Sequence, residues 1–365
     1  MAEIRIKNLR KEFGDFTAVQ SSSFKVEDGE FFMLLGPSGC GKTTTLRMIA
    51  GLELPTSGEI TIDGEDVSQM PASQRDIAFV FQMFALYPHM NVRKNISYPL
   101  TSQGMSRDEV QRKVAEVAAT LEIENLLDQP VSGLSGGDRQ RVALGRAIVR
   151  SPKCFLMDEP LGALDAEFRE HMAEELRKLH DRMGATTVYV THDQLEAMQM
   201  GDKIVVMNHG VIEQFGTPQQ IYDTPMTMFV AQFIGSPPMN FLDFEAELET
   251  GASTVSLHEE AFKVPQLHQT CAGKLVFGVR PEHVRLSDST RYRGEITATE
   301  YLGTTQIVTL NTPNGEVKAR IASDQVARVG EQVGLVFEDS KITLFDRPSG
   351  HAIRSALNEG VKSHG

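Results

Sequence analysis

The sequence has few cysteines and no long apolar run. Its three cysteines, Cys40, Cys154 and Cys271, lie far apart and are odd in number, so they provide neither a disulfide framework nor a metal knuckle. Reduced thiols in a cytosolic protein are the simplest interpretation. No stretch approaches the ~20 apolar residues that a membrane-spanning helix needs, and residues 1–7 lack the apolar core of a signal peptide. We therefore expect any role at a membrane to depend on a partner protein.

Positive charge is also scarce. The chain has 36 lysines and arginines against 49 aspartates and glutamates, which gives a formal net charge of −13. Nucleic acid and anionic lipid would repel such a chain, so general binding of either is excluded. Apolar residues make up 41% and charged residues 23%, the mixture of an ordinary globular protein. The length of 365 residues predicts two or three domains.

The pattern of apolar residues predicts an α/β domain followed by a β domain. Short apolar runs at residues 31–35, 154–157, 187–190 and 204–207 are typical of parallel strands buried on both faces. Helical patterns lie between them. After residue 235 short alternating strands dominate, and Asn314-Gly315 marks a hairpin. We predict an α/β domain over residues 1–235, with a helical subdomain at about 85–150, and a small all-β, OB-like domain over residues 236–365. We expect the segment after Pro348 to be loosely ordered.

A phosphate-binding loop follows the first buried run. Residues 36–43 fit G-x-x-x-x-G-K-[ST] between a predicted strand and a predicted helix, which is the context that this motif requires. Backbone N–H groups and the helix N-terminus would hold phosphate oxygens, Lys42 would bridge the β- and γ-phosphates, and Thr43 would ligate Mg²⁺. The alternative is a glycine-rich turn that matches by chance. The predicted nucleotide-binding residues here are Gly36, Pro37, Ser38, Gly39, Cys40, Gly41, Lys42, Thr43 and Thr44. Because a helix N-terminus lowers the pKa of a thiol, we expect a lowered pKa for Cys40.

Two carboxylates follow the buried run at residues 154–157. Asp158, at the end of a strand, could hold Mg²⁺ directly or through water, and Glu159 could polarise an attacking water. An ordinary strand end is the alternative for an isolated Asp-Glu pair, but its position after a phosphate loop favours the functional interpretation.

A second anion-binding helix start lies at residues 134–138. Its members are Leu134, Ser135, Gly136, Gly137 and Asp138, and no lysine accompanies them. One phosphate tail does not need two such sites in one chain. We interpret this segment as serving the γ-phosphate of a nucleotide held by another subunit; the alternative is a helix cap without a ligand.

Together these motifs resemble those of the ATPase subunit of an ABC transporter. The phosphate loop, Gln82, the LSGG segment, the Asp158-Glu159 pair, Asp165 and His192 occur in the family's order. The resemblance implies that Phe13 stacks on adenine. It implies that Gln82 senses Mg²⁺ and water, so that the metal site comprises Thr43, Gln82 and Asp158. Glu159 would be the general base, His192 would contact the γ-phosphate and Glu159, and Asp165 would cross the dimer interface.

Two positions depart from the family pattern. Asp138 replaces the usual Gln, and Gly162 replaces the usual Ser. A carboxylate is tolerable beside a helix N-terminus and could accept a bond from a ribose hydroxyl, but it would also face a triphosphate. One hypothesis is that the chain pairs with a different ATPase and forms two unequal sites. The alternative is neutral variation in a homodimer.

The C-terminal sequence narrows the class. Residues 233–241 and 278–284 resemble the maltose-importer type of ATPase, which serves sugars, polyols and glycerol-3-phosphate. Residues 84–92, from Phe84 to Val92, correspond to the groove that receives a coupling helix of the membrane subunits, although these aromatics could instead pack inside the helical subdomain. The resemblance implies ATP and Mg²⁺ as cofactors. The implied partners are a second ATPase subunit, two membrane permease subunits and, indirectly, an extracytoplasmic solute-binding protein.

These features predict an ATPase at the cytoplasmic face of a prokaryotic plasma membrane, energising a carbohydrate-type importer. A polyamine, sulfate or iron importer is the nearest alternative. A non-transport ABC ATPase usually has two cassettes or a long coiled coil, and a basic surface would help it; this chain has none of these. A P-loop kinase would have no use for LSGG and His192.

Overall fold

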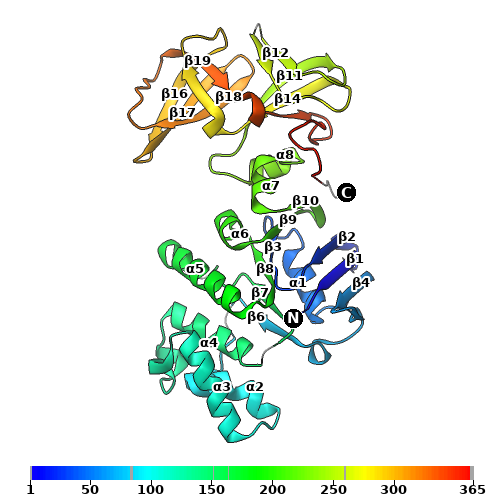
Figure 1. Ribbon diagram of the computed structural model, residues 1–365, viewed down its shortest axis with the longest axis vertical. Coiled ribbons are helices and arrows are strands. Elements are labelled where there is room, and N and C mark those ends of the chain that lie inside the picture. Colours follow the sequence, from blue (N-terminus) through cyan, green and yellow to red (C-terminus); the bar gives the residue numbers. More distant parts are fainter. Residues whose placement is uncertain (1, 83–84, 151, 163, 259, 362–365) are drawn as a thin grey trace. The chain divides into compact units, whose positions relative to one another are not determined.

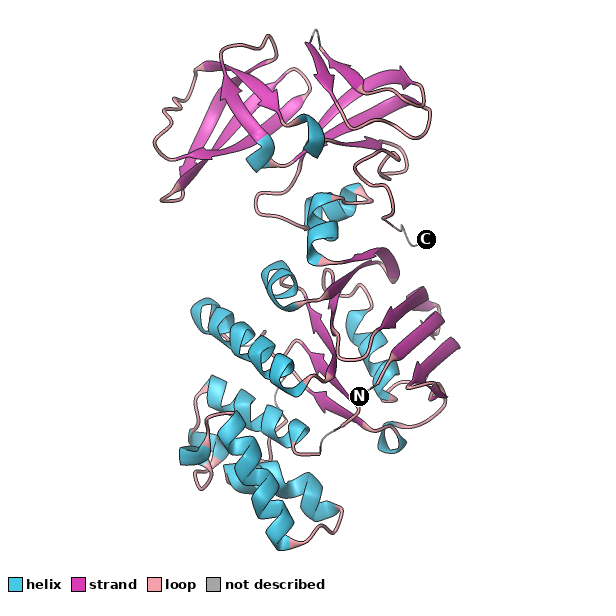
Figure 2. Cartoon of the chain, viewed as in Figure 1, coloured by secondary structure: helices cyan, strands magenta, loops and turns pink. Residues whose placement is uncertain are grey.

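The chain folds into two units that differ in composition. The computed structural model describes residues 2–82, 85–150, 152–162, 164–258 and 260–361. Contacts divide the chain between Ile212 and Glu213. The N-terminal unit mixes strands and helices, whereas the C-terminal unit consists mostly of strands (Figure 1, Figure 2).

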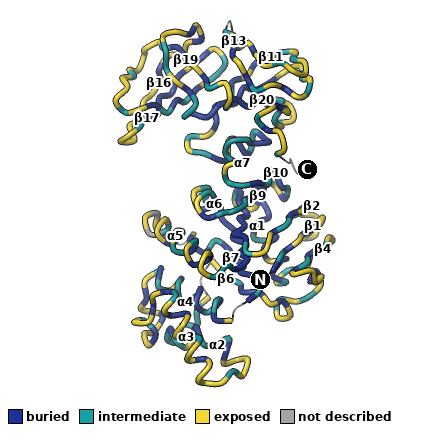
Figure 3. Tube along the Cα trace, viewed as in Figure 1, coloured by how far each residue is buried: buried dark blue, intermediate teal, exposed yellow. Residues whose placement is uncertain are grey.

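A six-stranded sheet forms the centre of the N-terminal unit. Its order is β10 (Val211–Gly216), β9 (Lys203–Asn208), β3 (Phe31–Leu35), β8 (Thr186–Thr191), β7 (Cys154–Asp158) and β6 (Ile77–Val80). Strands β9, β3, β8, β7 and β6 are parallel. Every residue of β3, β7 and β8 is buried, as Figure 3 shows for the centre of this unit. The prediction of parallel strands buried on both faces is confirmed.

Helices cover both faces of this sheet. Figure 1 shows α5 (Ala166–Met183) and α6 (Gln194–Met200) on one side and α1 (Lys42–Ala50) on the other. A second, antiparallel sheet has the order β2 (Phe16–Val26), β1 (Ile4–Phe13), β4 (Ser57–Ile62) and β5 (Glu65–Asp66). A 3₁₀ turn, η1 (Ala72–Gln74), precedes β6.

Three helices lie between β6 and β7. They are α2 (Val92–Ser102), α3 (Arg107–Thr120) and α4 (Gly136–Ile148), with 3₁₀ turns η2 (Glu124–Leu126) and η3 (Val131–Gly133) between the last two. Each helix begins after a polar cap, Asn91, Ser106 or Ser135, whose side chain accepts a backbone N–H of the first turn. Within the described ranges, none of the helices combines the length and the hydropathy needed to cross a membrane.

The C-terminal unit begins at Glu213, within β10, and continues through two short helices into further strands. The helices are α7 (Pro218–Asp223) and α8 (Met228–Phe233). The first sheet has the order β11 (Asn240–Leu248), β14 (Cys271–Val279), β20 (Thr343–Asp346), and the second has β15 (Val284–Ser287), β19 (Gln332–Phe337), β16 (Arg293–Tyr301), β17 (Thr305–Thr312), β18 (Gly315–Ala322). A hairpin joins β12 (Thr254–Leu257) to β13 (Glu260–Lys263), and 3₁₀ turns η4 (Pro281–His283) and η5 (Asp339–Lys341) follow β14 and β19.

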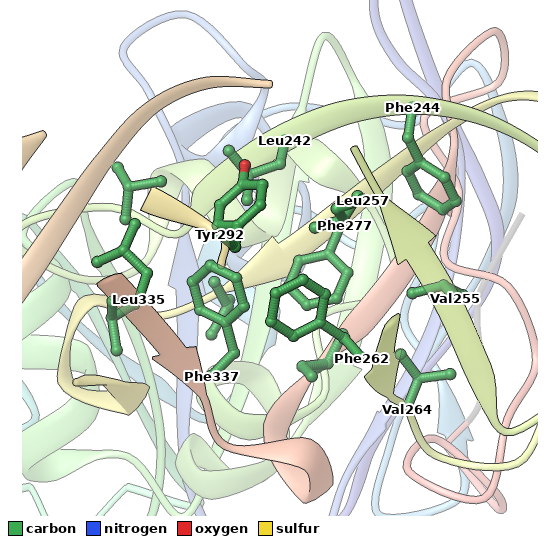
Figure 4. Close-up of a cluster of buried hydrophobic side chains, with 14 of the residues drawn as sticks. Leu242, Phe244, Val255, Leu257, Phe262, Val264, Phe277, Tyr292, Leu335 and Phe337 are labelled. Carbon is green, nitrogen blue, oxygen red and sulfur yellow. The ribbon is translucent and has the colours of Figure 1, made fainter. Parts of the chain in front are cut away.

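Aliphatic and aromatic side chains fill the core between these strands (Figure 4). The rings of Phe262 and Tyr292 lie 5.5 Å apart at 89°, and those of Phe277 and Phe337 lie 5.2 Å apart. Edge-to-face and tilted pairs at these distances add to the stabilisation from burial. The Tyr292 hydroxyl bonds Thr312 Oγ1 at 3.0 Å, so its burial leaves no polar atom unpaired.

Two local predictions in this unit have opposite outcomes. The hairpin at Asn314-Gly315 is confirmed, since β17 and β18 pair in register on either side of it. The expectation of loose order after Pro348 is wrong for residues up to Val361. Ile353 is buried, its amide donates to the Leu344 carbonyl at 2.7 Å, and Asn358 Nδ2 donates to the Ile353 carbonyl at 2.9 Å. Such isolated backbone pairings leave no periodic pattern in the sequence.

A buried arginine joins the two short helices to the strands. Arg280, at the end of β14, donates through Nε and Nη2 to the Tyr222 carbonyl at 2.9 and 2.7 Å, and through Nη1 to the Ile234 carbonyl at 2.7 Å. Its guanidinium carbon stands 3.7 Å from the centre of the Tyr222 ring, and the Tyr222 hydroxyl donates to Glu282 Oε1. Burial lowers the pKa of Arg280. Helices α7 and α8 therefore fold as part of the C-terminal unit.

Candidate active site

The carboxyl ends of four adjacent parallel strands bring the predicted catalytic residues together. Gln82 follows β6, the Asp158-Glu159 pair ends β7, His192 follows β8, and the phosphate loop follows β3. These strands are neighbours in the sheet, so their carboxyl ends lie at one edge. Ligands of open α/β sheets bind at this edge.

The phosphate loop has the backbone geometry that only glycine allows. Gly41 caps α1 with a φ of 104°, and a Cβ at this position would lie 2.6 Å from the Ala18 carbonyl oxygen. A Cβ at Gly36 would collide with the Met207 carbonyl oxygen. The glycines thus let the loop pack against neighbouring backbone while the N–H groups at the start of α1 stay available to an anion.

Lys42 folds back over this loop. Its Nζ donates to the carbonyl oxygens of Gly36 and Pro37 at 2.8 and 2.9 Å, and the side chain is buried. Both partners are neutral acceptors, so phosphate oxygens could replace them with stronger, charge-assisted bonds. Thr44 is partly buried, while Ser38 and Gly39 are exposed on the loop.

The expectation for Cys40 is wrong. Burial raises the pKa of its thiol, and the nearby Lys42 ammonium only partly opposes this effect. The thiol is almost fully buried beside the loop, so loss of hydration outweighs the field of the helix N-terminus.

Thr43 and Asp158 provide two adjacent oxygen ligands. Thr43 Oγ1 donates to Asp158 Oδ1 at 2.9 Å. Burial raises the pKa of Asp158, the neighbouring Glu159 carboxylate adds to this rise, and the Thr43 bond and Arg47 oppose it. A hydroxyl and a carboxylate are the ligands that Mg²⁺ prefers, and Mg²⁺ bound to phosphates needs few protein ligands. The residues therefore fit a magnesium ion, which would also offset the cost of burying Asp158.

Glu159 lies at the centre of the remaining contacts. Its Oε2 lies 3.3 Å from Gln82 Nε2, which donates to it, and 3.3 Å from His192 Nδ1. Its backbone has a φ of 44°, a conformation that costs energy for any residue with a Cβ. The bond from the Glu159 amide to the Val190 carbonyl, at 3.0 Å, holds the Glu159 backbone beside the end of β8.

Other predicted residues lie apart from this centre. Phe13 ends β1 as a half-exposed ring, with Lys11 Nζ 4.7 Å from its centroid, and no described contact joins it to the phosphate loop. Ser135 caps α4, and its side chain bonds Asp138 alone among the described residues. Gly136 and Gly137 open this helix, and Leu134 is buried before it. Phe84 lies outside the described residues.

Sequence analysis missed an arginine that links two of the loops. Arg169 on α5 donates through Nη2 to the Leu164 carbonyl at 2.9 Å, beside Asp165, and its Nη1 lies 3.2 Å from Asp193 Oδ2, beside His192. Behind them Glu196 accepts the hydroxyls of Thr191 and Tyr189 at 2.7 and 3.0 Å, and burial raises its pKa. The signal was present, because Arg169 and Glu196 each stand four residues after a predicted site residue, one helical turn away.

A groove lies along the end of α4 beside the segment that follows Gln82. Its volume is about 490 Å³, and aromatic and cationic side chains line it. Arg146 Nη1 donates to the Ala85 carbonyl at 2.6 Å, and its guanidinium lies 5.3 Å from the Tyr87 ring centre. Tyr87 packs on Tyr98 at 4.7 Å, and Tyr98 remains 41% exposed. The groove thus presents apolar rings to solvent next to the catalytic loop.

Comparison with known proteins gives the same class. The ABC transporter family model matches residues 19–162, the MalK OB fold domain matches residues 235–284, and the TOBE domain matches residues 277–345. Among solved structures, the bacterial ABC transporter cassette MJ0796, solved as a dimer, has a TM-score of 0.53 and 33% identity over 59% of this chain and 98% of that chain. Fold and site define the chain as an ABC ATPase.

Relatives over the full length place it more narrowly. The chain is 47% identical to the trehalose/maltose import ATP-binding protein MalK of Thermococcus litoralis, over 97% of this chain and 100% of that protein. It is 45% identical to the sn-glycerol-3-phosphate import ATP-binding protein UgpC of a Ruegeria species, over 97% and 99%. The chain belongs to the family of ABC importer ATP-binding subunits with a MalK OB fold and a TOBE domain.

Proposed function

We propose that this chain hydrolyses ATP to drive import of a sugar, a polyol or a glycerol-3-phosphate-like solute. The names of the full-length relatives support this solute class. The observation that carries the catalytic part is the contact of Glu159 with both Gln82 and His192, beside the Thr43–Asp158 pair.

Binding begins at the phosphate loop. Lys42 exchanges its two carbonyl partners for the β- and γ-phosphates, and the N–H groups at the start of α1 hold the remaining oxygens. Thr43 and Asp158, with Gln82, would hold Mg²⁺, whose charge neutralises the phosphate oxygens when it is bound. The exposed ring of Phe13 offers a surface on which adenine can stack.

Hydrolysis depends on Glu159. Its carboxylate accepts a proton from water as the water oxygen bonds to the γ-phosphorus, while the bond from that phosphorus to the bridging oxygen breaks. ADP and inorganic phosphate are the products. Gln82 and His192 hold the carboxylate in place, and His192, which is half exposed, can also reach the γ-phosphate.

A second ATPase subunit and two membrane permeases complete the assembly that we propose. The Ser135 end of α4 would close on ATP held by the partner ATPase, with Asp165 at the same interface. The exposed rings in the groove at Tyr87 and Tyr98 suit a helix of a permease. The chain would thus act at the cytoplasmic face of a prokaryotic plasma membrane, with an extracytoplasmic solute-binding protein as an indirect partner.

Three variants of the full-length chain test the catalytic proposal. Glu159→Gln should lower the ATPase rate by about 10²–10⁴-fold, because a general base contributes that much, and should still bind ATP. Lys42→Ala should lose ATP binding. Glu167→Gln, an exposed carboxylate on α5, is the matched control and should behave as the parent. A parental ATPase rate in Glu159→Gln would remove Glu159 from the mechanism.

A further inference from the structure

A hydrogen bond at the start of α4 engages the side chain of Ser135, the serine of the LSGG segment. Ser135 Oγ donates to Asp138 Oδ2 at 2.7 Å, and the Asp138 amide donates to Ser135 Oγ at 3.1 Å. A serine hydroxyl has a single proton. In this structure that proton is donated in the hydrogen bond to the Asp138 carboxylate, so Ser135 has no further proton to donate to an anion.

The same carboxylate changes the charge of the helix start. An α-helix offers roughly half a positive charge at its N-terminus, and Asp138 places a full negative charge in the first turn of α4. Both effects weaken this end of α4 as a phosphate site. They act on the surface that, under the proposed function, meets the γ-phosphate of ATP held by a second subunit.

We propose that Asp138 competes with the partner's ATP for the Ser135 hydroxyl. Closure of two subunits on ATP then requires Ser135 to exchange a bond to Asp138 for a bond to the γ-phosphate. Asp138 is a positioning residue in this scheme. It raises the ATP concentration needed for closure, and it favours reopening when the γ-phosphate leaves.

A second helix in the chain shows that helix capping does not require this bond. Ser106 caps α3 and accepts the Glu109 amide at 3.4 Å, so Glu109 stands where Asp138 stands in α4. Within the described parts of the chain, the Glu109 carboxylate takes no hydrogen bond from Ser106 Oγ. Glu109 lies on a helix without predicted contact to nucleotide, which makes it the matched control for Asp138.

ATP affinity of the full-length chain tests the proposal, which rests on the proposed function. Equilibrium dialysis with labelled Mg·ATP uses the chain carrying Glu159→Gln, so that hydrolysis does not consume the ligand. Asp138→Gln should bind ATP about tenfold more tightly, the size of one charge-assisted bond. Asp138→Asn removes the charge but keeps an amide oxygen in the position of the Asp138 carboxylate, whereas the Gln side chain is one methylene longer and carries its amide oxygen away from Ser135. Asp138→Asn should therefore show part of this gain. Glu109→Gln should change the affinity less than about twofold.

A double-mutant cycle separates competition from a general charge effect. If Asp138 holds the hydroxyl, Ser135→Ala should cost less than about twofold in the parent, but about tenfold when Asp138→Gln is present. Equal costs in both backgrounds, with Asp138→Gln binding ATP as the parent does, would overturn the proposal and leave Asp138 as a helix cap. If Lys42→Ala bound ATP as the parent does, the proposed function itself would fail, independently of every Asp138 variant.

Discussion

At the scale of single residues, the site depends on side chains whose chemistry burial has changed. Asp158 keeps a raised pKa because it is buried next to Glu159, and Glu159 occupies a strained backbone conformation. Strain of this kind persists where the surrounding structure fixes it, here through the bond from the Glu159 amide to the Val190 carbonyl. These costs are consistent with the binding of a cation and the polarisation of water that we propose for this site.

The thiol of Cys40 gives a prediction with a definite pH dependence. Burial favours the neutral thiol and raises its pKa, so the reactive thiolate is rarer near pH 7 than in free cysteine. Alkylation by a maleimide should be slow at pH 7 and should accelerate as the pH rises toward and beyond about 9. Bound ATP should protect Cys40, because the loop then closes on phosphate.

The other cysteines allow a clean measurement of that labelling. Burial raises the pKa of Cys154 to about 12, so it should stay unreactive. Mass spectrometry of digested protein would separate Cys40 from the partly exposed Cys271, and Cys40→Ala supplies the background. Fast labelling of Cys40 at pH 7, unaffected by ATP, would contradict the place of this thiol under the nucleotide.

At the scale of elements, α5 connects two loops that act together in the mechanism we propose. Arg169 bonds the Leu164 carbonyl and Asp193, and Asp193 in turn caps α6 by accepting the Leu195 amide at 2.8 Å. The loop of Asp165 and the loop of His192 are therefore held by one side chain. Displacement of one loop should disturb the other.

Removal of Arg169 should separate hydrolysis from binding. We expect Arg169→Met to lower kcat about 10- to 100-fold, since small misplacement of a catalytic group has effects of this size, while KM for ATP changes little. Arg169→Lys keeps the positive charge but cannot make both hydrogen bonds, so its kcat should lie between those of the parent and of Arg169→Met. Steady-state ATPase kinetics check this prediction. A parental kcat in Arg169→Met would show that the two loops are positioned independently.

The sequence predicted the helices and strands better than it predicted the tertiary contacts between them. The buried runs and the phosphate loop could be read directly, because parallel strands and P-loops have strong local patterns. The contacts of Arg280 could not, since its donors reach backbone carbonyls 58 and 46 residues away in the sequence. For Arg169, by contrast, the four-residue spacing from Asp165 did carry a signal. The raised pKa of Cys40 was missed for a similar reason: burial is a tertiary property, whereas the helix N-terminus is visible in the sequence.

At the scale of the whole molecule, the boundary between the two units that the contacts define lies earlier in the chain than the boundary that the sequence pattern predicts. Strand patterns begin after residue 235, yet α7 and α8 already belong to the C-terminal unit. Arg280 contributes to this division, because it donates to the carbonyls of Tyr222 and Ile234. We therefore propose residue 213 as the start of the second folding unit.

Fragments test this boundary. A fragment over residues 213–365 should unfold cooperatively in urea. A fragment over residues 236–365 leaves the buried guanidinium of Arg280 without its carbonyl partners. This fragment should be less stable by roughly 3 kcal/mol or fail to fold. Arg280→Met in the shorter fragment removes the unpaired charge and separates this effect from loss of the helices. Equal stability of the two fragments would return the boundary to residue 235.

The most direct test of the central claim, an ATPase that energises a membrane importer, is the composition of the intact assembly. The tagged chain would be purified from gently solubilised membranes of its native host and weighed by native mass spectrometry. The account predicts two ATPase subunits together with two membrane permease subunits. Recovery of the chain from cytosol alone, in good yield and with no membrane subunit attached, would contradict it.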